Sequence, residues 1–418
     1  MAIPMPGPAG VYRIDWMWAL DLLSLYCDYV FPLYGLSSVQ LHKGLDDIVI
    51  KETALSYIDG ESGKLYYVGY PIEELAEYSS YEEVCFLLLH QRLPTSSEFR
   101  EFSMHMVNER GLPPEFNIFI KTIPRQAPMM DILKTAVDFL ALYDPELQTH
   151  ESEANIRKAI RLTAKIPTAI AYSYRHKAGL DIIEPSDKLS HAANFLYMIT
   201  GEKPDSLASK IMDVAFILHA EHELPASSTA ALVVASTLSD LYSAISAGIG
   251  ALKGPLHGGA NERALEMLLS IGRPDRVWDY VKSVLASGGK IMGFGHRVYK
   301  SYDPRAKILK RYLETLCQLR GDYKLLEIAN TLEEAVRAEL VGKPVFPNID
   351  LYSGAVFHML GLPIEVFTPM FAAARTVGWS SHVIEYWRNN RLIRPRAHYI
   401  GPEPRRYVPI ELRHEERY

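Results

Sequence analysis

Two short segments each place a histidine among glycines. His257 lies in GPLHGGAN, and His296 lies in GFGHRVYK, which is followed by Arg305. Glycines let a ligand approach the backbone closely, and an arginine near a histidine favours the binding of an anion. Each segment also has an ordinary interpretation: a tight turn between helices for the first, and a solvated turn for the second.

Two further segments place a charged side chain in apolar sequence. Asp350 ends FPNID, directly before an apolar stretch, and Arg375 follows three alanines in AAARTVGW. A carboxyl between apolar side chains has a raised pKa, which suits a general base, although Asp350 could equally cap a helix. A buried arginine needs an anionic partner, which is either a protein carboxylate or a ligand.

His219 and His222 end a predicted helix in the segment HAEHE, before Pro225. Two histidines three residues apart share a helix face, so a metal site is conceivable. The segment is not the HExxH motif, however, and no cysteine lies nearby. A histidine at a helix end is more often a capping or core residue.

The elements around these residues are predicted to be mostly helical. Strands are expected at 48–50 and 65–68, around the turn-rich segment 59–63. Capping boxes at Ser80 and Thr95, each with a glutamate three residues later, predict two helix starts.

Two more helices are predicted further along the chain. One begins at Ser186 or Asp187 and ends at Gly201. The other spans 227–252, where small residues alternate with Leu, Val and Ile on every side, as in a helix buried in the core or in a subunit interface. Its Asp240 argues against a membrane span.

The bulk composition sets limits on size and partners. A chain of 418 residues predicts two or three domains, and a net charge of −6 argues against nucleic acid as a partner. The three cysteines are far apart, with Cys85 expected to be a buried free thiol, which favours the reducing cytoplasm. The alternative is a single structural disulfide, as in intracellular proteins of hyperthermophiles.

The N-terminal segment 12–35 is apolar but interrupted by three aspartates. It is therefore expected to be an accessory helix that packs on the body or on a partner subunit rather than a membrane span. Attachment to a membrane surface is the alternative, and we expect no membrane partner.

The segments GPLHGGAN, GFGHRVYKSYDPR, FPNIDLYSG and ARTVGW together resemble the motifs of the citrate synthase family, in order and in spacing. The resemblance runs from about Lys43 to Gly401. It departs in the first 40 or so residues, which have no recognised counterpart, and at Pro225, where many members carry Asn.

The resemblance implies an all-α homodimer with a small N-terminal β-hairpin in each subunit. It implies an N-terminal extension over 1–42, a large helical domain over 43–258 and 362–418, and a small helical domain over 259–361 that closes on the substrates. It implies neither a metal nor a cofactor, because the CoA thioester is itself a substrate.

The resemblance also assigns roles to individual residues. The catalytic places fall on His257, His296 and Asp350. The oxaloacetate places fall on His222, Arg305, Arg375 and, from the other subunit, Arg394. The CoA places fall on the adenine-recognition loop Ile291, Met292, Gly293, Phe294 and Gly295, and on Lys300 and Lys343 for phosphate.

Physical reasoning supports these roles. Arginines hold the two carboxylates of oxaloacetate in a fixed geometry. Asp350 would take a methyl proton from acetyl-CoA while His257 stabilises the enolate oxygen, and His296 would polarise the ketone. The alternatives are a 2-methylcitrate synthase that uses propionyl-CoA, a dual-specificity enzyme, and a non-catalytic helical protein that binds acyl-CoA.

Overall fold

The computed structural model describes residues 41–45 and 48–413. It divides the chain into a compact unit, Lys51–Arg394, and a second unit formed by the two chain ends. In the described part of the second unit, the regular elements are the 3₁₀ turns η1 (Lys43–Leu45) and η4 (Ile410–Leu412). The helix predicted within 12–35 lies outside the described residues.

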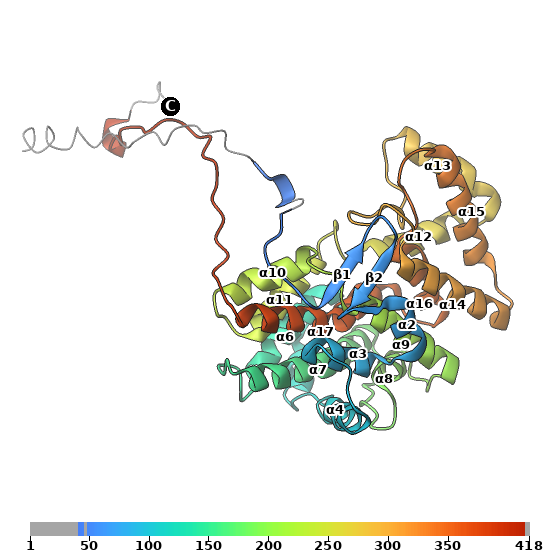
Figure 1. Cartoon of the computed structure of the whole chain (residues 1–418), viewed down its shortest axis with the longest axis horizontal. Coiled ribbons are helices and arrows are strands. Elements are labelled where there is room, and N and C mark those ends of the chain that lie inside the picture. The colour runs from blue at the N-terminus through green and yellow to red at the C-terminus, as the bar shows by residue number, and fades with distance from the viewer. Residues whose placement is uncertain (1–40, 46–47, 414–418) are drawn as a thin grey trace, which may run out of the picture. The chain divides into compact units, whose positions relative to one another are not determined.

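The unit Lys51–Arg394 is built almost entirely of helices (Figure 1). Its first helices are α2 (Ile72–Tyr78), α3 (Tyr81–His90), α4 (Ser96–Asn108), α5 (Phe116–Thr122), α6 (Met129–Ala141), α7 (Ser152–Ala178), α8 (His191–Thr200), α9 (Ser206–Ala220), α10 (Ala226–Ser236) and α11 (Leu241–Leu252). The later ones are α12 (Ala260–Ile271), η2 (Pro274–Arg276), α13 (Val277–Ala286), α14 (Pro304–Arg320), α15 (Lys324–Glu339), α16 (Ile349–Met359), η3 (Ile364–Val366) and α17 (Phe367–Trp387).

Helix α17 is the central element of the core. It is buried from Phe367 to Ile384 apart from Phe371, and it packs on α3, α7, α9, α10 and α11. The helices α12 to α16 pack mainly on one another, at one side of the unit in Figure 1. The predicted all-α fold is therefore confirmed, whereas the predicted boundaries of a large and a small domain stay a prediction.

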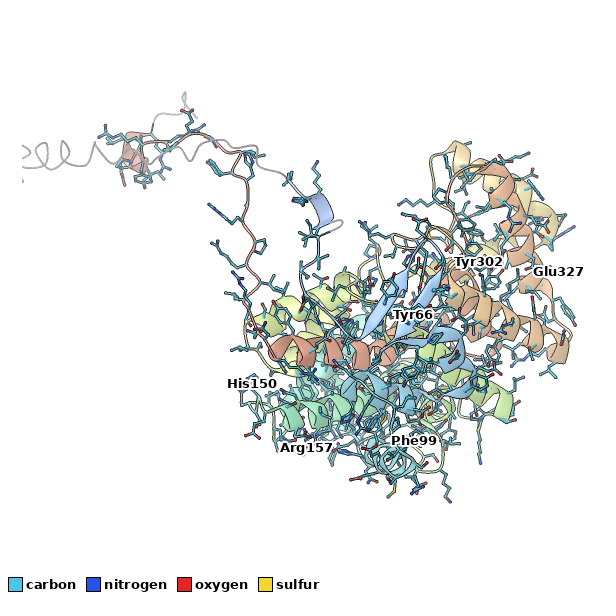
Figure 2. The ribbon with its side chains drawn as sticks, viewed as in Figure 1. Tyr66, Phe99, His150, Arg157, Tyr302 and Glu327 are labelled. Carbon is cyan, nitrogen blue, oxygen red and sulfur yellow. The ribbon has the colours of Figure 1, made fainter. Side chains whose placement is uncertain are left out.

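A small antiparallel sheet, in the order β1–β2–β3, precedes the helices. Its strands are β1 (Ser56–Asp59), β2 (Lys64–Tyr67) and β3 (Tyr70–Pro71). The predicted hairpin is confirmed, but its first strand is not at 48–50. Ile58 and Leu65 pair across the hairpin and are buried, whereas Val49 is 87% exposed. Burial of one strand face decides which apolar run becomes the strand. Figure 2 marks Tyr66 on β2.

The helix caps follow the sequence signals only in part. The complete capping box is present at Thr95 and Glu98. Ser80 accepts from the backbone N–H of Glu83 as predicted, but the Glu83 carboxylate accepts a hydrogen bond from Ser79 instead of returning to the cap.

Helix α8 begins later than predicted. Its N-cap residue is Ser190 rather than Ser186 or Asp187, because the backbone N–H of Ser186 donates to the side chain of Asn194 and belongs to the preceding loop. Gly201 ends the helix in the left-handed conformation (φ 85°), as predicted.

The buried helix predicted over 227–252 is two helices, α10 and α11. Asp240 is the N-cap of α11 and accepts from the backbone N–H of Ser243 at 2.9 Å. The single-helix prediction was wrong, because the sequence alone does not distinguish an aspartate that caps a new helix from an aspartate inside one long helix. The two helices pack on each other and on α17, in the core.

Cys85 and Cys317 are free and buried, so the prediction for Cys85 is confirmed. None of the helices in the described residues has the length and apolar character needed to cross a membrane.

Candidate active site

The loop before His296 and the loop before Asp350 are hydrogen-bonded to each other. The backbone N–H of Gly295 donates to the Phe346 carbonyl at 2.8 Å, and that of Asn348 donates to the Gly293 carbonyl at 2.9 Å. The Asn348 side chain also donates to the Gly295 carbonyl at 2.8 Å. Two motifs more than fifty residues apart are thus held as one structure.

Glycine is required at Gly293 for this contact. Its φ is +78°, and a Cβ there would lie 2.7 Å from the Cβ of Leu351 in α16. Such a distance is a clash, and a positive φ strains other residues. Gly293 therefore allows close contact between the two loops.

The β1–β2 turn supports the other end of the His296 loop. The Gly60 carbonyl accepts from the backbone N–H of Lys300 at 2.9 Å and from the Ser301 hydroxyl at 3.1 Å. A Cβ at Gly60 would lie 2.3 Å from the Val298 carbonyl oxygen. The turn of the predicted hairpin thus holds the loop after His296 in place.

His296 is held with its ring proton on Nε2. Its Nδ1 accepts from the backbone N–H groups of Val298 and Tyr299, both at 3.1 Å, so Nδ1 carries no proton. Burial and the Arg305 guanidinium lower the pKa of His296 to about 4. The ring is therefore neutral near pH 7, with Nε2–H available as a donor.

His222 lies beside His296, just after α9. The two ring centroids are 5.1 Å apart, and His222 Nε2 is 3.2 Å from the Tyr299 hydroxyl. Burial, and then the Arg305 charge, hold the pKa of His222 well below its ordinary value. His222 is therefore a second neutral imidazole at this place.

Arg305 lies in the first turn of α14 and is buried. Its guanidinium donates twice to Asp303, from Nε at 3.0 Å and from Nη2 at 2.8 Å. Burial alone would lower the pKa of Arg305, but the Asp303 carboxylate raises it overall. Asp303 is also the N-cap of α14, so the helix start fixes this arginine before any ligand binds.

Arg375 lies in the middle of α17 and is only partly paired. Its Nε donates to the His219 carbonyl at 2.7 Å, and its guanidinium lies 4.9 Å from the ring centre of Phe371. Within the described residues its buried Nη1 has no hydrogen-bond partner. An unpaired buried guanidinium N–H is costly, so an anionic ligand fits this place.

Asp350 is half-buried in the first turn of α16, and Asn348, not Asp350, is the N-cap. The interpretation of Asp350 as a cap is therefore wrong. Burial raises the pKa of the Asp350 carboxyl to about 6, although the nearby Arg305 charge opposes the rise. That pKa suits a group that takes a proton near neutral pH.

His257 lies in the turn between α11 and α12. Its Nε2 is 2.8 Å from the Ser227 hydroxyl oxygen, which accepts from the indole N–H of Trp379 at 3.2 Å. The Ser227 hydroxyl has no other partner in the described residues, and a buried hydroxyl proton needs an acceptor. Its proton therefore points at His257 Nε2, and the ring proton lies on Nδ1. Burial and the Arg375 charge lower the pKa of His257 to about 4. Ser227 and Trp379 were missed by sequence reasoning.

The predicted residues are only partly brought together. His222, His296 and Arg305 meet around Tyr299. Asp350 lies close enough to Arg305 for that charge to act on its carboxyl. Arg394 is exposed beyond α17, and Lys343 is exposed on a separate loop.

The remaining CoA candidates lie in the loop that pairs with the Asp350 loop. Ile291 and Gly293 are buried, and Met292, Phe294 and Gly295 are half-buried. Lys300 is exposed, and its ammonium donates to the Arg297 carbonyl at 3.3 Å.

His219 is buried, and its Nδ1 lies 2.7 Å from the Ala215 carbonyl, to which it donates. Its Nε2 has no hydrogen-bond partner in the described residues. Across 41–45 and 48–413, no group of three or more His, Cys, Asp or Glu side chains is arranged to hold a metal ion.

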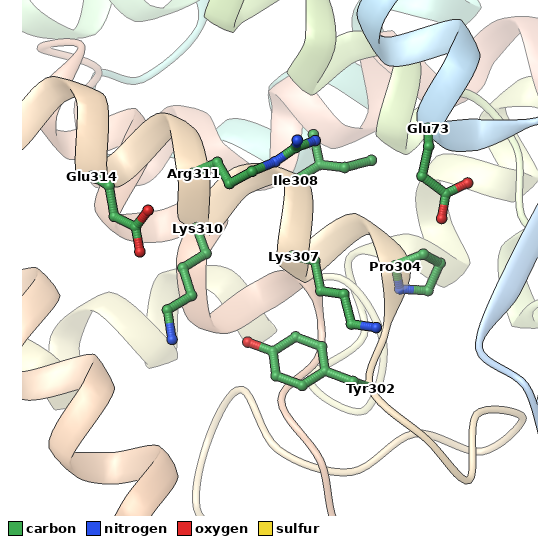
Figure 3. Close-up of a pocket in the computed structure, with 8 residues that line it drawn as sticks. All are labelled: Glu73, Tyr302, Pro304, Lys307, Ile308, Lys310, Arg311 and Glu314. Atoms are coloured by element: carbon green, nitrogen blue, oxygen red, sulfur yellow. The ribbon is translucent and has the colours of Figure 1, made fainter.

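A cavity of about 480 Å³ lies elsewhere, between α2 and α14 (Figure 3). It is lined by Glu73, Tyr302, Pro304, Lys307, Ile308, Lys310, Arg311 and Glu314. None of the predicted site residues lines it, although Arg305 belongs to the same helix. The cavity is therefore separate from the paired loops.

Residues 44–396 match the family model described as citrate synthase, C-terminal domain. The chain belongs to the citrate synthase family. The predicted family and enzyme class, an acyltransferase of the citrate synthase type, are therefore confirmed.

Individual members of the citrate synthase family are similar over nearly the whole chain. Citrate synthase 2 of Bacillus subtilis is 45% identical over 89% of this chain and 99% of its own length. The citrate/2-methylcitrate synthase of the same organism is 42% identical over 86% of this chain and 96% of its own.

A solved structure with a matching fold is the citrate synthase of Thermoplasma acidophilum, described as a ternary complex with carboxymethyl coenzyme A and oxaloacetate. It is 38% identical, covers 90% of this chain and 100% of its own, and has a TM-score of 0.85.

Proposed function

We propose that this chain condenses acetyl-CoA with oxaloacetate and water to give citrate and CoA, at the paired loops, as in the tricarboxylic acid cycle. The observation that supports this most is the hydrogen bonding between two loops. One loop leads to Asp350, whose pKa is raised to about 6, and the other leads to His296, an imidazole fixed as a neutral donor. A base and an electrophile on adjoining loops suit proton abstraction followed by attack on a ketone.

Oxaloacetate is bound by charge and by directed donors. Arg305 and the unpaired Nη1 of Arg375 bind its carboxylates. His222 donates to another oxygen of the substrate. His296 donates its Nε2–H to the ketone oxygen, so the ketone carbon becomes electrophilic and the alkoxide that forms is stabilised.

The acyl group is activated on the other side of the site. Asp350 takes a proton from the methyl carbon, and the Nδ1–H of His257 stabilises the enolate oxygen of the thioester. The methyl carbon then bonds to the ketone carbon. Water finally attacks the thioester carbon, and CoA leaves as a thiol. Each step uses side chains or substrates, so we propose no cofactor.

The CoA moiety is proposed to lie on the backbone of Ile291–Gly295, with Lys300 and Lys343 near its phosphates. Both lysines are exposed, and an ammonium group attracts a phosphate. The partners of the chain are thus acetyl-CoA and oxaloacetate.

The functional assembly is proposed to be a homodimer in the cytoplasm, with Arg394 entering the site of the other subunit. Arg394 is exposed after α17 and is followed by Pro395, which stiffens the chain. A stiff arm of this kind is suited to cross a two-fold interface.

A second candidate substrate is propionyl-CoA, favoured by the 42% identity to the citrate/2-methylcitrate synthase. One methylene is worth only about 1–3 kcal/mol in a pocket. The test is thiol release from each acyl-CoA in the presence of oxaloacetate. We expect a higher kcat/KM for acetyl-CoA; a higher value for propionyl-CoA would reverse the assignment, and no release from either would indicate an acyl-CoA-binding protein.

A further inference from the structure

Tyr299 lies among three side chains that the proposed function assigns to oxaloacetate. Its ring centroid is 4.8 Å from that of His296 and 5.5 Å from that of His222. The guanidinium carbon of Arg305 is 5.9 Å from the same ring. Tyr299 is only 1% exposed, so both its ring and its hydroxyl are inside the protein.

The Tyr299 hydroxyl fixes the direction of one hydrogen bond. It lies 3.2 Å from Nε2 of His222 and has no other hydrogen-bond partner in the described residues. A buried hydroxyl proton needs an acceptor, and His222 Nε2 is the acceptor within reach. Nε2 therefore carries no proton, and the ring proton of neutral His222 lies on Nδ1.

This tautomer leaves a donor of His222 for the substrate. Within the described residues Nδ1 of His222 makes no hydrogen bond to the protein and is not among the fully buried unpaired atoms. Its N–H is therefore free to donate to an oxygen of a bound dicarboxylate. The opposite tautomer would place a lone pair there, which repels an anion.

The backbone of Tyr299 acts on the neighbouring histidine. Its N–H donates to Nδ1 of His296 at 3.1 Å, together with that of Val298. The proton of His296 is thus kept on Nε2. Tyr299 therefore determines which ring nitrogen carries the proton in both histidines. Its hydroxyl acts on His222, and its backbone amide acts on His296.

We propose that Tyr299 is a positioning residue of the oxaloacetate site, whose hydroxyl holds His222 as the Nδ1–H tautomer and whose amide helps to hold His296 as the Nε2–H tautomer. The inference deepens the proposed function and rests on it. It predicts that the two parts of Tyr299 have separable effects, because a side-chain substitution leaves the amide in place.

The first test is Tyr299→Phe, which removes only the hydroxyl. The KM for oxaloacetate is expected to rise roughly three- to tenfold, the effect of one lost hydrogen bond. Because the amide still orders His296, kcat and the KM for acetyl-CoA stay within about twofold. An unchanged oxaloacetate KM, or a loss confined to kcat, would overturn the inference.

The matched control is Tyr302→Phe. Tyr302 lies three residues away, and its hydroxyl donates to Glu333 at 2.7 Å, away from the site residues. Removal of this hydroxyl should leave all three kinetic constants unchanged. An equal rise in the oxaloacetate KM would mean that loss of a hydroxyl loosens the whole loop, and the specific role of Tyr299 would be wrong.

The second test needs no activity. ¹⁵N-histidine NMR of the full chain, with His222 assigned by its loss in His222→Gln, distinguishes protonated from unprotonated ring nitrogens. We expect Nδ1 of His222 to carry the proton in the wild type, and both tautomers to appear in Tyr299→Phe. A proton on Nε2 in the wild type would overturn the inference. Absence of oxaloacetate-dependent thiol release would instead refute the proposed function, while the spectrum still decides the tautomer.

Discussion

The paired loops that lead to His296 and Asp350 differ from the part of the site around Arg375 of α17. The difference is whether their buried polar groups have hydrogen-bond partners within the protein. Around His296 and Arg305 the backbone and Asp303 supply hydrogen bonds with fixed directions. Around Arg375 several buried atoms have no partner in the described residues, namely Arg375 Nη1, Glu221 Oε2 and His219 Nε2. The paired side is built before the ligand arrives, as catalytic groups require. On the unpaired side the Nη1–H donor of Arg375 is left for an anionic ligand.

The largest expected effect comes from the paired side. Asp350→Asn keeps the size of the side chain but removes the base, so kcat should fall by roughly 10²- to 10⁴-fold. Steady-state thiol release measures this. The control is Asp275→Asn, which changes an exposed acid in η2, and it should retain normal turnover. A near-normal kcat in Asp350→Asn would mean that another group takes the proton.

The next effect concerns Arg394. If each site combines Asp350 of one chain with Arg394 of the other, the variants Asp350→Ala and Arg394→Ala should each be nearly inactive. Refolding them together at equal amounts makes about half the dimers mixed, and each mixed dimer contains one intact site. Roughly a quarter of the wild-type activity should return. No rescue, with mixed dimers verified by mass spectrometry, would place both residues in one chain.

The two buried arginines should differ in their effect on stability. Arg305→Met leaves the buried Asp303 carboxylate without its ion pair and should lower the free energy of unfolding by about 3–5 kcal/mol. Arg375→Met removes a guanidinium that is only partly paired, and should cost about 1–3 kcal/mol. Denaturant unfolding without substrate measures both. Equal losses of unfolding free energy would contradict the difference in pairing between Arg305 and Arg375.

Asp350 should also link stability to pH. Its folded pKa of about 6 lies above the ordinary value of 3.8, so the folded protein binds the proton more tightly than the unfolded chain. The stabilisation from this proton is complete below pH 4 and is lost as the pH rises through 6. Asp350→Asn should therefore be more stable than the wild type at pH 8, by at most about 3 kcal/mol. Unfolding curves of both proteins at pH 5 and pH 8 test whether the stability difference between them is smaller at pH 5.

The site was predictable from sequence where residue type and glycine spacing coincide. His296 and Asp350 stand out because their motifs place polar groups in glycine-rich or apolar sequence. Ser227 and Tyr299 do not stand out, because a serine or tyrosine hydroxyl becomes informative only when its distant partner is known. Their partners, His257 and His222, lie 30 and 77 residues away.

The fold was predictable in class but less so in its boundaries. Apolar periodicity identifies helices and the small hairpin. It does not reveal that Asp240 separates α10 from α11, or that the strand begins at Ser56. Both depend on tertiary burial, which composition does not encode.

The central claim is that Asp350 takes the proton, whereas Arg305, Arg375 and His222 bind oxaloacetate without it. The most direct test is calorimetric titration of oxaloacetate into Asp350→Asn, on the same sample whose turnover is measured. We predict a dissociation constant within about threefold of the wild type while kcat has collapsed. Loss of oxaloacetate binding together with turnover would contradict this separation of roles.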